Sequence, residues 1–350
     1  MRRIKRSLGV LAAAVLAVAG VSAGSASAAT PPVATTKAAW QADISHVQAP
    51  GSGCYRAAFP TLAWHAVACV AAPKVPLVPA PSRSAKHAGP QTVGDGHDYS
   101  AVVTGLISKA TGTFKSVSSN ITEKGAVGGT GPQVANSFSL QLNTQFISGS
   151  PACSGAGTPS NCQAWQQFVY TYQTKSTSYI FMQYWLIDYD ATCPSGWMAF
   201  SSDCYTNSNA NTVKTVTAKQ LATVQLSGTA KTGGKDAVSL SVGSGQATMV
   251  TGKDTKIHLA KFWNTTEWGV YGDGGGSGAT FGASNSLRAQ TALTATSGAK
   301  APKCVLEGFT GETNNLKLAK TAAIGSQPSP TMASKQTDGT AGTASCAVAP

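Results

Sequence analysis

The sequence predicts an all-β fold, a sandwich or jelly roll, for residues 93–350. From Val93 onward glycine, serine, threonine and asparagine dominate the composition. Short apolar or aromatic runs recur about every ten to fifteen residues between turn-forming residues, which is typical of strands. Long stretches with the period of an amphipathic helix are missing. Because all-β folds reach about 250 residues as one unit, we expect a single domain here.

The expected strands are rich in β-branched and aromatic residues. In chain order they are Tyr99–Ile107, Phe138–Phe146, Trp165–Tyr172, Tyr179–Tyr189, Val213–Leu226, Ala237–Val242, Ala247–Thr251, Ile257–Leu259, Glu267–Tyr271, Ala279–Phe281 and Leu287–Leu293. One short helix, Ala218–Ala222, is expected to interrupt the fifth of these strands.

Apolar and amide side chains alternate in several of these strands. Leu140 and Leu142 point to one face, whereas Gln141 and Asn143 point to the other. Amides and large aromatic groups also mix at Gln166, Gln167, Gln183 and Trp185. One face of each strand in a sandwich meets the core, so the other face would suit a polar polymer, either an extended peptide or a cell-wall polymer. An ordinary solvated outer face is the alternative.

Residues 1–28 are typical of a secretory signal peptide. Four cations precede an apolar stretch from Leu8 to Val21, and Ala26-Ser27-Ala28 is a small-residue cleavage site. The apolar stretch is short for a membrane span, and no later stretch approaches about 20 apolar residues. We therefore expect a secreted protein that has no stable membrane insertion after signal cleavage and that acts as a monomer.

Residues 29–92 are expected to form a separate N-terminal segment. Trp40 and the apolar part of Cys54–Ala72 suit a small disulfide-clipped unit. Residues Pro73–Pro90 are rich in proline, alanine and lysine, as in an extended linker. The whole segment is interpreted either as a pro-segment that is later removed or as a small wall-binding or docking element.

The charge distribution argues against nucleic acid as a partner. The formal net charge is +12, and it falls to +8 once the four cations of residues 1–28 are removed. The remaining cations are scattered as single residues between threonine, serine and glycine, and no basic cluster alternates with aromatic residues. Such a charge suits weak adhesion to an anionic cell wall.

Eight cysteines fit an oxidising, extracellular destination. They fall as near neighbours along the chain, so local pairing is the simplest expectation, although sequence alone leaves the connectivity open. Local pairing gives Cys54–Cys69, Cys153–Cys162, Cys193–Cys204 and Cys304–Cys346. No CxxC motif is present and no histidine stands at a ligand spacing from a cysteine pair, so we expect no metal and no cofactor.

Glu267 is the most informative carboxylate of the chain. Only 14 residues are acidic, and Glu267 lies in an apolar and aromatic run that ends at Tyr271. A carboxylate in such a place is costly to desolvate, so it is usually hydrogen-bonded or working as an acid or base. The alternative is a strand-end carboxylate bonded to backbone amides of the glycine-rich loop Asp273–Ser277.

The order of elements around Glu267 resembles the eqolisins, a family of secreted glutamic peptidases. The resemblance rests on Thr266-Glu267-Trp268-Gly269-Val270, on Ala279-Thr280-Phe281 after a polar loop, and on the run Leu287–Thr291. It spans about residues 136–295, because upstream strands also follow in a matching order. The plant neprosin-type glutamic peptidases are similar, with a second glutamate in place of a glutamine. The resemblance implies a concanavalin-like double-sheet β-sandwich that hydrolyses peptide bonds.

The resemblance also implies roles for individual residues. Glu267 matches the catalytic glutamate, a general acid/base, and Gln167 suits the partner glutamine that stabilises the oxyanion. Gln166, on the opposite face, and Gln141, on the neighbouring strand, are alternatives to Gln167. Another superposition puts Cys162 at that position and removes the amide. The expected substrate groove is made of Gln141, Asn143, Gln166, Gln183, Trp185, Trp268 and Glu312.

Two other functions stay open on the same fold. Asp188 or Asp190 could form a glycanase pair with Glu267, since glycosidic hydrolysis needs two carboxyls about 5–9 Å apart. A non-catalytic module that binds cell-wall glycan or peptide is the second. A chymotrypsin-like protease is excluded, because Gly274 stands where the nucleophile of a Gly-Asp-Ser-Gly-Gly motif would stand.

Overall fold

The computed structural model describes residues 32–81, 92–243, 245–296, 302–324, 331–337 and 345–348. The chain from Pro32 to Pro350 forms one compact unit. The expected signal peptide, residues 1–28, lies outside the described residues. Within the described part of the chain, no helix is long and apolar enough to cross a membrane.

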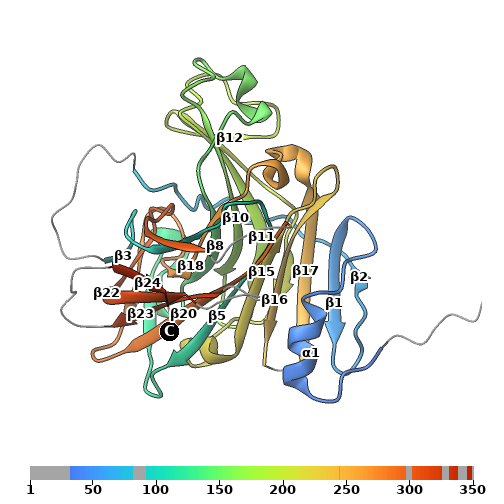
Figure 1. The fold of residues 1–350 in the computed structure, drawn as a ribbon, viewed down its shortest axis with the longest axis vertical. Helices are drawn as coiled ribbons and strands as arrows, with labels where there is room; N and C mark the ends of the chain where they lie inside the picture. The colour runs from blue at the N-terminus through green and yellow to red at the C-terminus, as the bar shows by residue number, and fades with distance from the viewer. Residues whose placement is uncertain are drawn as a thin grey trace, which may run out of the picture. The chain divides into compact units, whose positions relative to one another are not determined.

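The larger of two sheets in the described chain has 14 strands (Figure 1). Its order is β2 (His65–Val67), β1 (Gly53–Ala58), β17 (Gln246–Lys253), β16 (Lys235–Val242), β15 (Val224–Thr229), β5 (Ile107–Val117), β20 (Ser286–Ala295), β23 (Thr331–Thr337), β22 (Thr313–Ile324), β19 (Gly278–Phe281), β6 (Glu123–Ala126) and β7 (Gln133–Ala135). Both β3 (Thr92–Gly94) and β24 (Ser345–Val348) pair with β22.

The second sheet has 10 strands in the described chain and carries the candidate site. Its order is β12 (Met198–Phe200), β13 (Asp203–Asn207), β11 (Ser178–Ile187), β10 (Gln163–Tyr172), β8 (Ser139–Thr144), β18 (Thr265–Tyr271), β4 (Tyr99–Val102) and β21 (Lys303–Leu306). β14 (Asn211–Val213) pairs with β11, and β9 (Ile147–Ser148) pairs with β10. The described helices are α1 (Lys37–Ile44) and the 3-10 turns η1 (Val127–Gly129), η2 (Pro151–Gly155), η3 (Ala218–Thr223), η4 (Asp254–Lys256) and η5 (Leu259–Lys261).

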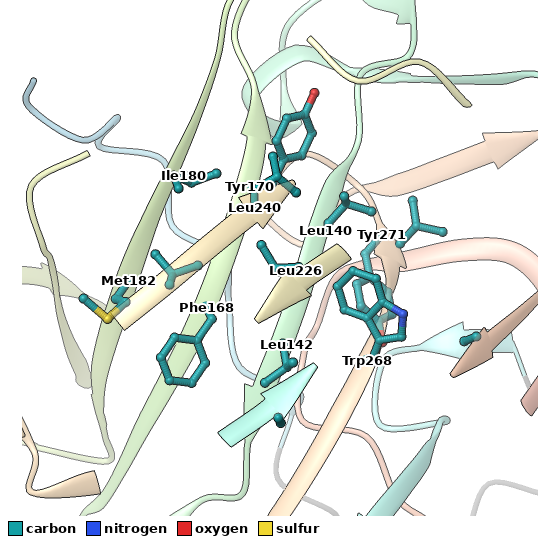
Figure 2. Packing of buried hydrophobic residues seen from close by; sticks show 14 of the residues in the cluster. Leu140, Leu142, Phe168, Tyr170, Ile180, Met182, Leu226, Leu240, Trp268 and Tyr271 are labelled. Atoms are coloured by element: carbon teal, nitrogen blue, oxygen red, sulfur yellow. The ribbon is translucent and has the colours of Figure 1, made fainter. Parts of the chain in front are cut away.

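The hydrophobic core lies between the two sheets (Figure 2). Trp268 of β18 and Phe168 of β10 point from the second sheet toward the first. Each ring fits over a glycine, because a Cβ added at Gly112 of β5 would lie 2.1 Å from Trp268 and one at Gly228 of β15 would lie 2.4 Å from Phe168. The Trp268 indole also donates to the Thr113 carbonyl at 3.0 Å. These contacts fix how the two sheets face each other.

The expected all-β double-sheet sandwich is confirmed, with three differences in its elements. The expected strand Tyr99–Ile107 is divided into β4 and the start of β5, and Val213–Leu226 is divided by η3, close to the expected helix. Ile257–Leu259 is not a strand. Its His258 has a left-handed φ of 59°, and Asp254 accepts the Ala260 amide, so the chain turns here rather than extending.

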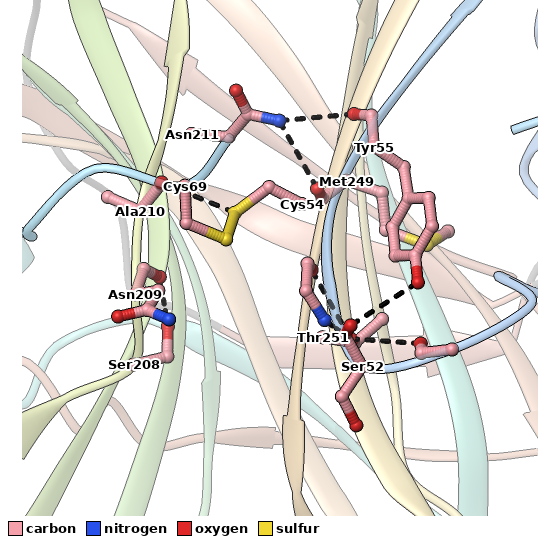
Figure 3. The surroundings of a disulfide bond; sticks show 12 residues. Ser52, Cys54, Tyr55, Cys69, Ser208, Asn209, Ala210, Asn211, Met249 and Thr251 are labelled. Atoms are coloured by element: carbon pink, nitrogen blue, oxygen red, sulfur yellow. Dashed lines mark hydrogen bonds between the residues drawn. A yellow bond between two sulfur atoms is a disulfide. The ribbon is translucent and has the colours of Figure 1, made fainter. Parts of the chain in front are cut away.

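Residues 32–81 pack against the sandwich and add strands to one of its sheets. β1 adds to β17, and the Cys54–Cys69 disulfide lies beside this junction (Figure 3). Asn211 of β14 donates to the carbonyls of Tyr55 and Met249, at 3.1 and 3.4 Å, and so links the two sheets. After β2 the chain continues without a helix or strand to residue 81.

Three of the expected disulfides are present. They are Cys54–Cys69, Cys153–Cys162 and Cys193–Cys204, and they close loops with sequence separations of 15, 9 and 11. Cys304 is also disulfide-bonded. Its expected partner, Cys346, lies outside the residues whose side chains the structure describes.

Candidate functional site

Four polar side chains form a row across the centre of the ten-stranded sheet. Asn143 of β8 lies opposite both Glu267 of β18 and Gln167 of β10, and Gln167 lies opposite Gln183 of β11. Residues directly opposite each other in a sheet share a face. We call this surface the polar face. All four side chains are fully buried, so other parts of the chain cover it.

Glu267 is held by one side-chain donor and one backbone donor. Its Oε2 accepts from Asn143 Nδ2 at 2.9 Å and from the Phe309 amide at 3.0 Å. Its Oε1 has no hydrogen-bond partner among the described residues. Burial raises the pKa of Glu267, and the bonds from Asn143 and Phe309 partly oppose that rise. Gly308 covers the carboxyl closely, since a Cβ there would lie 2.9 Å from Oε1.

A second carboxyl, Asp98, stands beside Glu267 just before β4. It accepts from the Gly94 amide at 2.9 Å and from the Tyr271 hydroxyl at 3.2 Å. Burial raises its pKa well above the usual range, and the charge of Glu267 raises it further. The pKa values of both carboxyls are raised, that of Asp98 more strongly, so a proton shared by the pair is favoured on Asp98. Two neighbouring carboxyls with different proton affinities are a common basis of acid–base chemistry.

Tyr271 reaches Asp98 because a glycine lies beneath its ring. Tyr271 and Glu267 are on the same side of β18, with Gly269 between them. A Cβ added at Gly269 would lie 2.4 Å from the Tyr271 hydroxyl, so any larger residue would displace the ring. The glycine of the Glu267–Tyr271 run thus brings a phenol to the carboxyl pair.

Amide side chains connect Glu267 to a third carboxyl, Glu312. Gln141 Oε1 accepts from Asn143 at 3.2 Å and from Gln167 at 3.1 Å, and Gln141 Nε2 donates to Glu312 Oε2 at 3.2 Å. The Thr310 hydroxyl donates to the same Glu312 oxygen at 2.6 Å. Burial raises the pKa of Glu312 to about 7 although these bonds lower it. A continuous network therefore joins two carboxyls that three strands, β19, β20 and β21, separate along the chain.

The extended segment Pro73–Ala80 lies over the polar face. The Leu77 amide donates to Gln183 Oε1 at 2.7 Å, and the Val78 amide donates to Glu312 Oε1 at 2.9 Å. Gln183 Nε2 in turn donates to the Val75 carbonyl at 3.0 Å. A stretch of backbone is therefore bound here through its own amide and carbonyl groups.

The structure brings most of the predicted site residues to the polar face but not all of them. Gln141, Asn143, Gln167, Gln183, Trp185, Glu267 and Glu312 lie there. Gln166 and Trp268 instead face the core between the sheets, because they alternate with Gln167 and Glu267 along their strands. Gln167 does not contact Glu267. Asn143 lies between them and supplies the amide.

Asp188 lies too far along β11 to pair with Glu267. It comes five residues after Gln183, which corresponds to roughly 17 Å of strand. Its amide donates to Asp203 at 2.8 Å, and Asp190 beside it is exposed. The carboxyl pair that a glycanase would need is therefore not formed with Glu267.

Sequence reasoning did not identify Asp98 or Tyr271 as members of the site. Asp98 lies in a glycine-rich turn before a short strand, and Tyr271 ends a strand whose apolar residues suit a core. Tyr271 carries a local signal, because it follows Glu267 by four residues in one strand and alternation puts both on the same face. Asp98 reaches the site only through the pairing of β4 with β18, which joins residues more than 160 apart in sequence. No local pattern encodes such a pairing.

The described residues contain no group of three or more histidine, cysteine, aspartate or glutamate side chains arranged to hold a metal ion. No family model and no curated protein matches this chain. Among solved structures the chain is similar to a crystal structure of Scytalido-glutamic peptidase with a peptide-based transition-state analogue. The match has 9% sequence identity and a TM-score of 0.30, and it covers 68% of this chain and 97% of the other.

Proposed function

We propose that this protein is a secreted endopeptidase of the glutamic type, with Glu267 as its general acid/base. The observation that carries the proposal is the backbone of Pro73–Ala80, bound on the polar face by Gln183 and Glu312. A surface that binds an extended chain through its main-chain groups is suited to a peptide substrate. Three disulfides support an extracellular destination.

The chemistry uses the carboxyl pair and the neighbouring amides. Glu267 as a carboxylate takes a proton from a water molecule that attacks the peptide carbonyl, and then gives that proton to the leaving amine. The C–N bond breaks, and the products are a carboxylic acid and an amine. The second N–H of the Gln167 amide, whose first N–H donates to Gln141, stabilises the oxyanion that forms on the carbonyl oxygen. The more strongly raised pKa of Asp98 favours a neutral Asp98 beside a charged Glu267.

Access to Glu267 requires a movement of the connection between β21 and β22. The Phe309 amide and Gly308 of this connection cover the carboxyl. When the connection moves aside, Glu267 loses the Phe309 hydrogen bond that lowers its pKa, and the entering water weakens the burial that raises it. The proposal therefore includes a closed state and an open state of this connection.

The test is Glu267→Gln, with casein hydrolysis measured at mildly acidic pH. The variant keeps the size of the side chain and removes its ability to exchange a proton, so activity should fall by about 10²- to 10⁴-fold. Glu307→Gln changes a nearby half-buried glutamate in the same way and should retain the parent activity. Undiminished hydrolysis by Glu267→Gln would exclude the role of this residue. If neither the parent nor a variant with Pro73–Ala80 displaced hydrolyses casein, the protein is not a peptidase.

A second candidate function is a non-catalytic module that binds peptide on the polar face. The complete burial of Glu267 favours it, because a covered carboxyl binds and orients but does not exchange protons with substrate. Incubation with a peptide that binds, followed by mass spectrometry of the peptide, separates the two functions. Intact peptide after long incubation indicates the module, and cleaved peptide indicates the peptidase.

A further inference from the structure

The segment Pro73–Ala80, here called the strap, is bound along almost its whole backbone. The carbonyls of Pro73 and Lys74 accept from Asn207 and from the Tyr205 hydroxyl, at 2.8 and 3.0 Å. The Pro76 and Val78 carbonyls accept from the amides of Gly275 and Gly311, both at 2.7 Å. The Ala80 amide donates to the Phe309 carbonyl at 2.8 Å. Such extensive use of main-chain groups is characteristic of a bound ligand rather than of a surface linker.

Two adjacent aliphatic side chains anchor the strap. Leu77 is fully buried in a cluster with Val169, Phe181 and Ala210. Val78 packs against a separate aromatic cluster that includes Trp165, Trp185, Tyr205 and Phe309. Lys74, by contrast, is exposed. The polar face thus has two apolar subsites next to each other, and each takes one aliphatic side chain.

Glycines on the opposite side let the strap lie close to the loops that border the polar face. A Cβ at Gly274 would lie 2.3 Å from Val75, and one at Gly311 would lie 2.8 Å from Val78. Gly274 also has a φ of 97°, which a side chain would disfavour. The loops around the strap therefore carry no side chains where the strap passes.

The prolines of the strap recur at every third position, at Pro73, Pro76 and Pro79. This spacing matches the three residues per turn of a polyproline II helix. Prolines lack an amide hydrogen, and the amides of Leu77, Val78 and Ala80, which follow Pro76, all find acceptors. Because a polyproline II segment is extended without a partner, we expect binding of the strap to cost little conformational entropy.

We propose that the strap is an intramolecular ligand that keeps the site closed, and that the polar face takes an extended peptide with two successive aliphatic residues once the strap leaves. The substrate part of this inference rests on the proposed function, whereas the binding part does not. Val78 binds Glu312 Oε1, and Glu312 is joined through Gln141 and Asn143 to Glu267. The strap therefore blocks the same hydrogen-bond network that holds the proposed acid/base.

The test displaces the strap in the full chain with Leu77→Asp, which puts a charge into an apolar subsite. The probe is a fluorescent peptide with the sequence of residues 72–81, and its binding is followed by fluorescence polarisation. Because the tethered strap competes at an effective concentration of about 1 mM, Leu77→Asp should bind the peptide at least about tenfold more tightly than the wild type. Casein hydrolysis should rise by a similar factor.

Two controls keep the test specific. Lys74→Asp introduces the same residue at an exposed position of the strap and should behave like the wild type. Gly311→Ala narrows the site where Val78 of the strap and Val78 of the probe peptide both bind, so it should weaken binding of the strap without strengthening binding of the free peptide. Hydrogen exchange of the Leu77 and Val78 amides should be slow in the wild type and fast in Leu77→Asp.

The outcomes separate the two proposals. Peptide binding by Leu77→Asp without hydrolysis supports the strap and contradicts the peptidase. Equal hydrolysis by wild type and Leu77→Asp, with equal peptide binding, overturns the strap and leaves the peptidase standing. Fast exchange of the Leu77 and Val78 amides in the wild type would also overturn the strap.

Discussion

At the scale of single residues, two neighbours, Asp98 and Asn143, have opposite effects on the charge of Glu267. Burial beside Asp98 makes a second negative charge costly, so one proton stays on the pair. Asn143 offers an N–H to Glu267 and so favours its charged form. A carboxyl in this setting is sensitive to any change in the number of donors around it.

Asn143→Asp should destabilise the protein in a pH-dependent way. The new side chain has the same shape, but above its pKa it accepts only and places another charge beside Glu267. We expect a loss of about 1 kcal/mol in the free energy of unfolding near pH 4 and of about 3 kcal/mol or more near pH 8. Urea unfolding at the two pH values measures it. Asn209→Asp, at an exposed position, should cost little at either pH, and an equal loss at both pH values for Asn143→Asp would contradict the reasoning.

At the scale of elements, the side chains of β10 and β18 alternate between the core and the polar face. Phe168 and Trp268 fill the core, whereas Gln167 and Glu267 lie on the polar face. The Phe168 and Trp268 rings leave no room for a side chain on the strands that face them, and glycine stands there, at Gly228 and Gly112. Small shifts between the sheets would therefore move the polar row as well.

Gly112→Ala should destabilise the sandwich by about 1–3 kcal/mol, because its methyl group would overlap the Trp268 ring. Gly105→Ala is the matched control, since the nearest atom to its added methyl group, Thr296 Oγ1, lies 3.5 Å away. Thermal unfolding of both variants measures the difference. Equal stability of Gly112→Ala and the parent would show that the sheets can move apart at no cost.

At the scale of the whole molecule, burial of carboxyls sets the dependence of stability on pH. Burial raises the pKa of Glu123 to about 8 and those of Asp273 and Glu312 to about 7. Burial also raises the pKa values of Asp98 and Glu267. Between about pH 4 and pH 8 the folded state then binds more protons than the unfolded state, so the free energy of unfolding falls as pH rises.

The melting temperature should therefore decrease steadily from about pH 4.5 to pH 8. Calorimetry in buffers of equal ionic strength measures it. Glu312→Gln removes one of the titrating groups. The difference in bound protons between the folded and unfolded states should then shrink by up to about one, so the melting temperature should fall less steeply with pH. A melting temperature that rises over this range would contradict the raised pKa values.

Much of the fold follows from local patterns, and much of the site does not. Leu140 and Leu142 lie in the core, as expected, and Gln141 and Asn143 lie on the other face, because a strand alternates whatever its neighbours are. The sequence predicts Gln167 as the catalytic partner of Glu267, with Gln166 and Gln141 as alternatives. The amide that hydrogen-bonds Glu267 in the structure is that of Asn143, because β8 lies between β10 and β18.

The sequence by itself determined the all-β class, the short disulfide loops and the unusual position of Glu267, since strand alternation, loop closure and carboxylate desolvation act over a few residues. Only the tertiary structure decided that Asp98, Glu312 and the strap meet near Glu267. These groups come from distant parts of the chain, and strand pairings across such separations depend on how the whole core packs. Local residue patterns do not predict how the whole core packs.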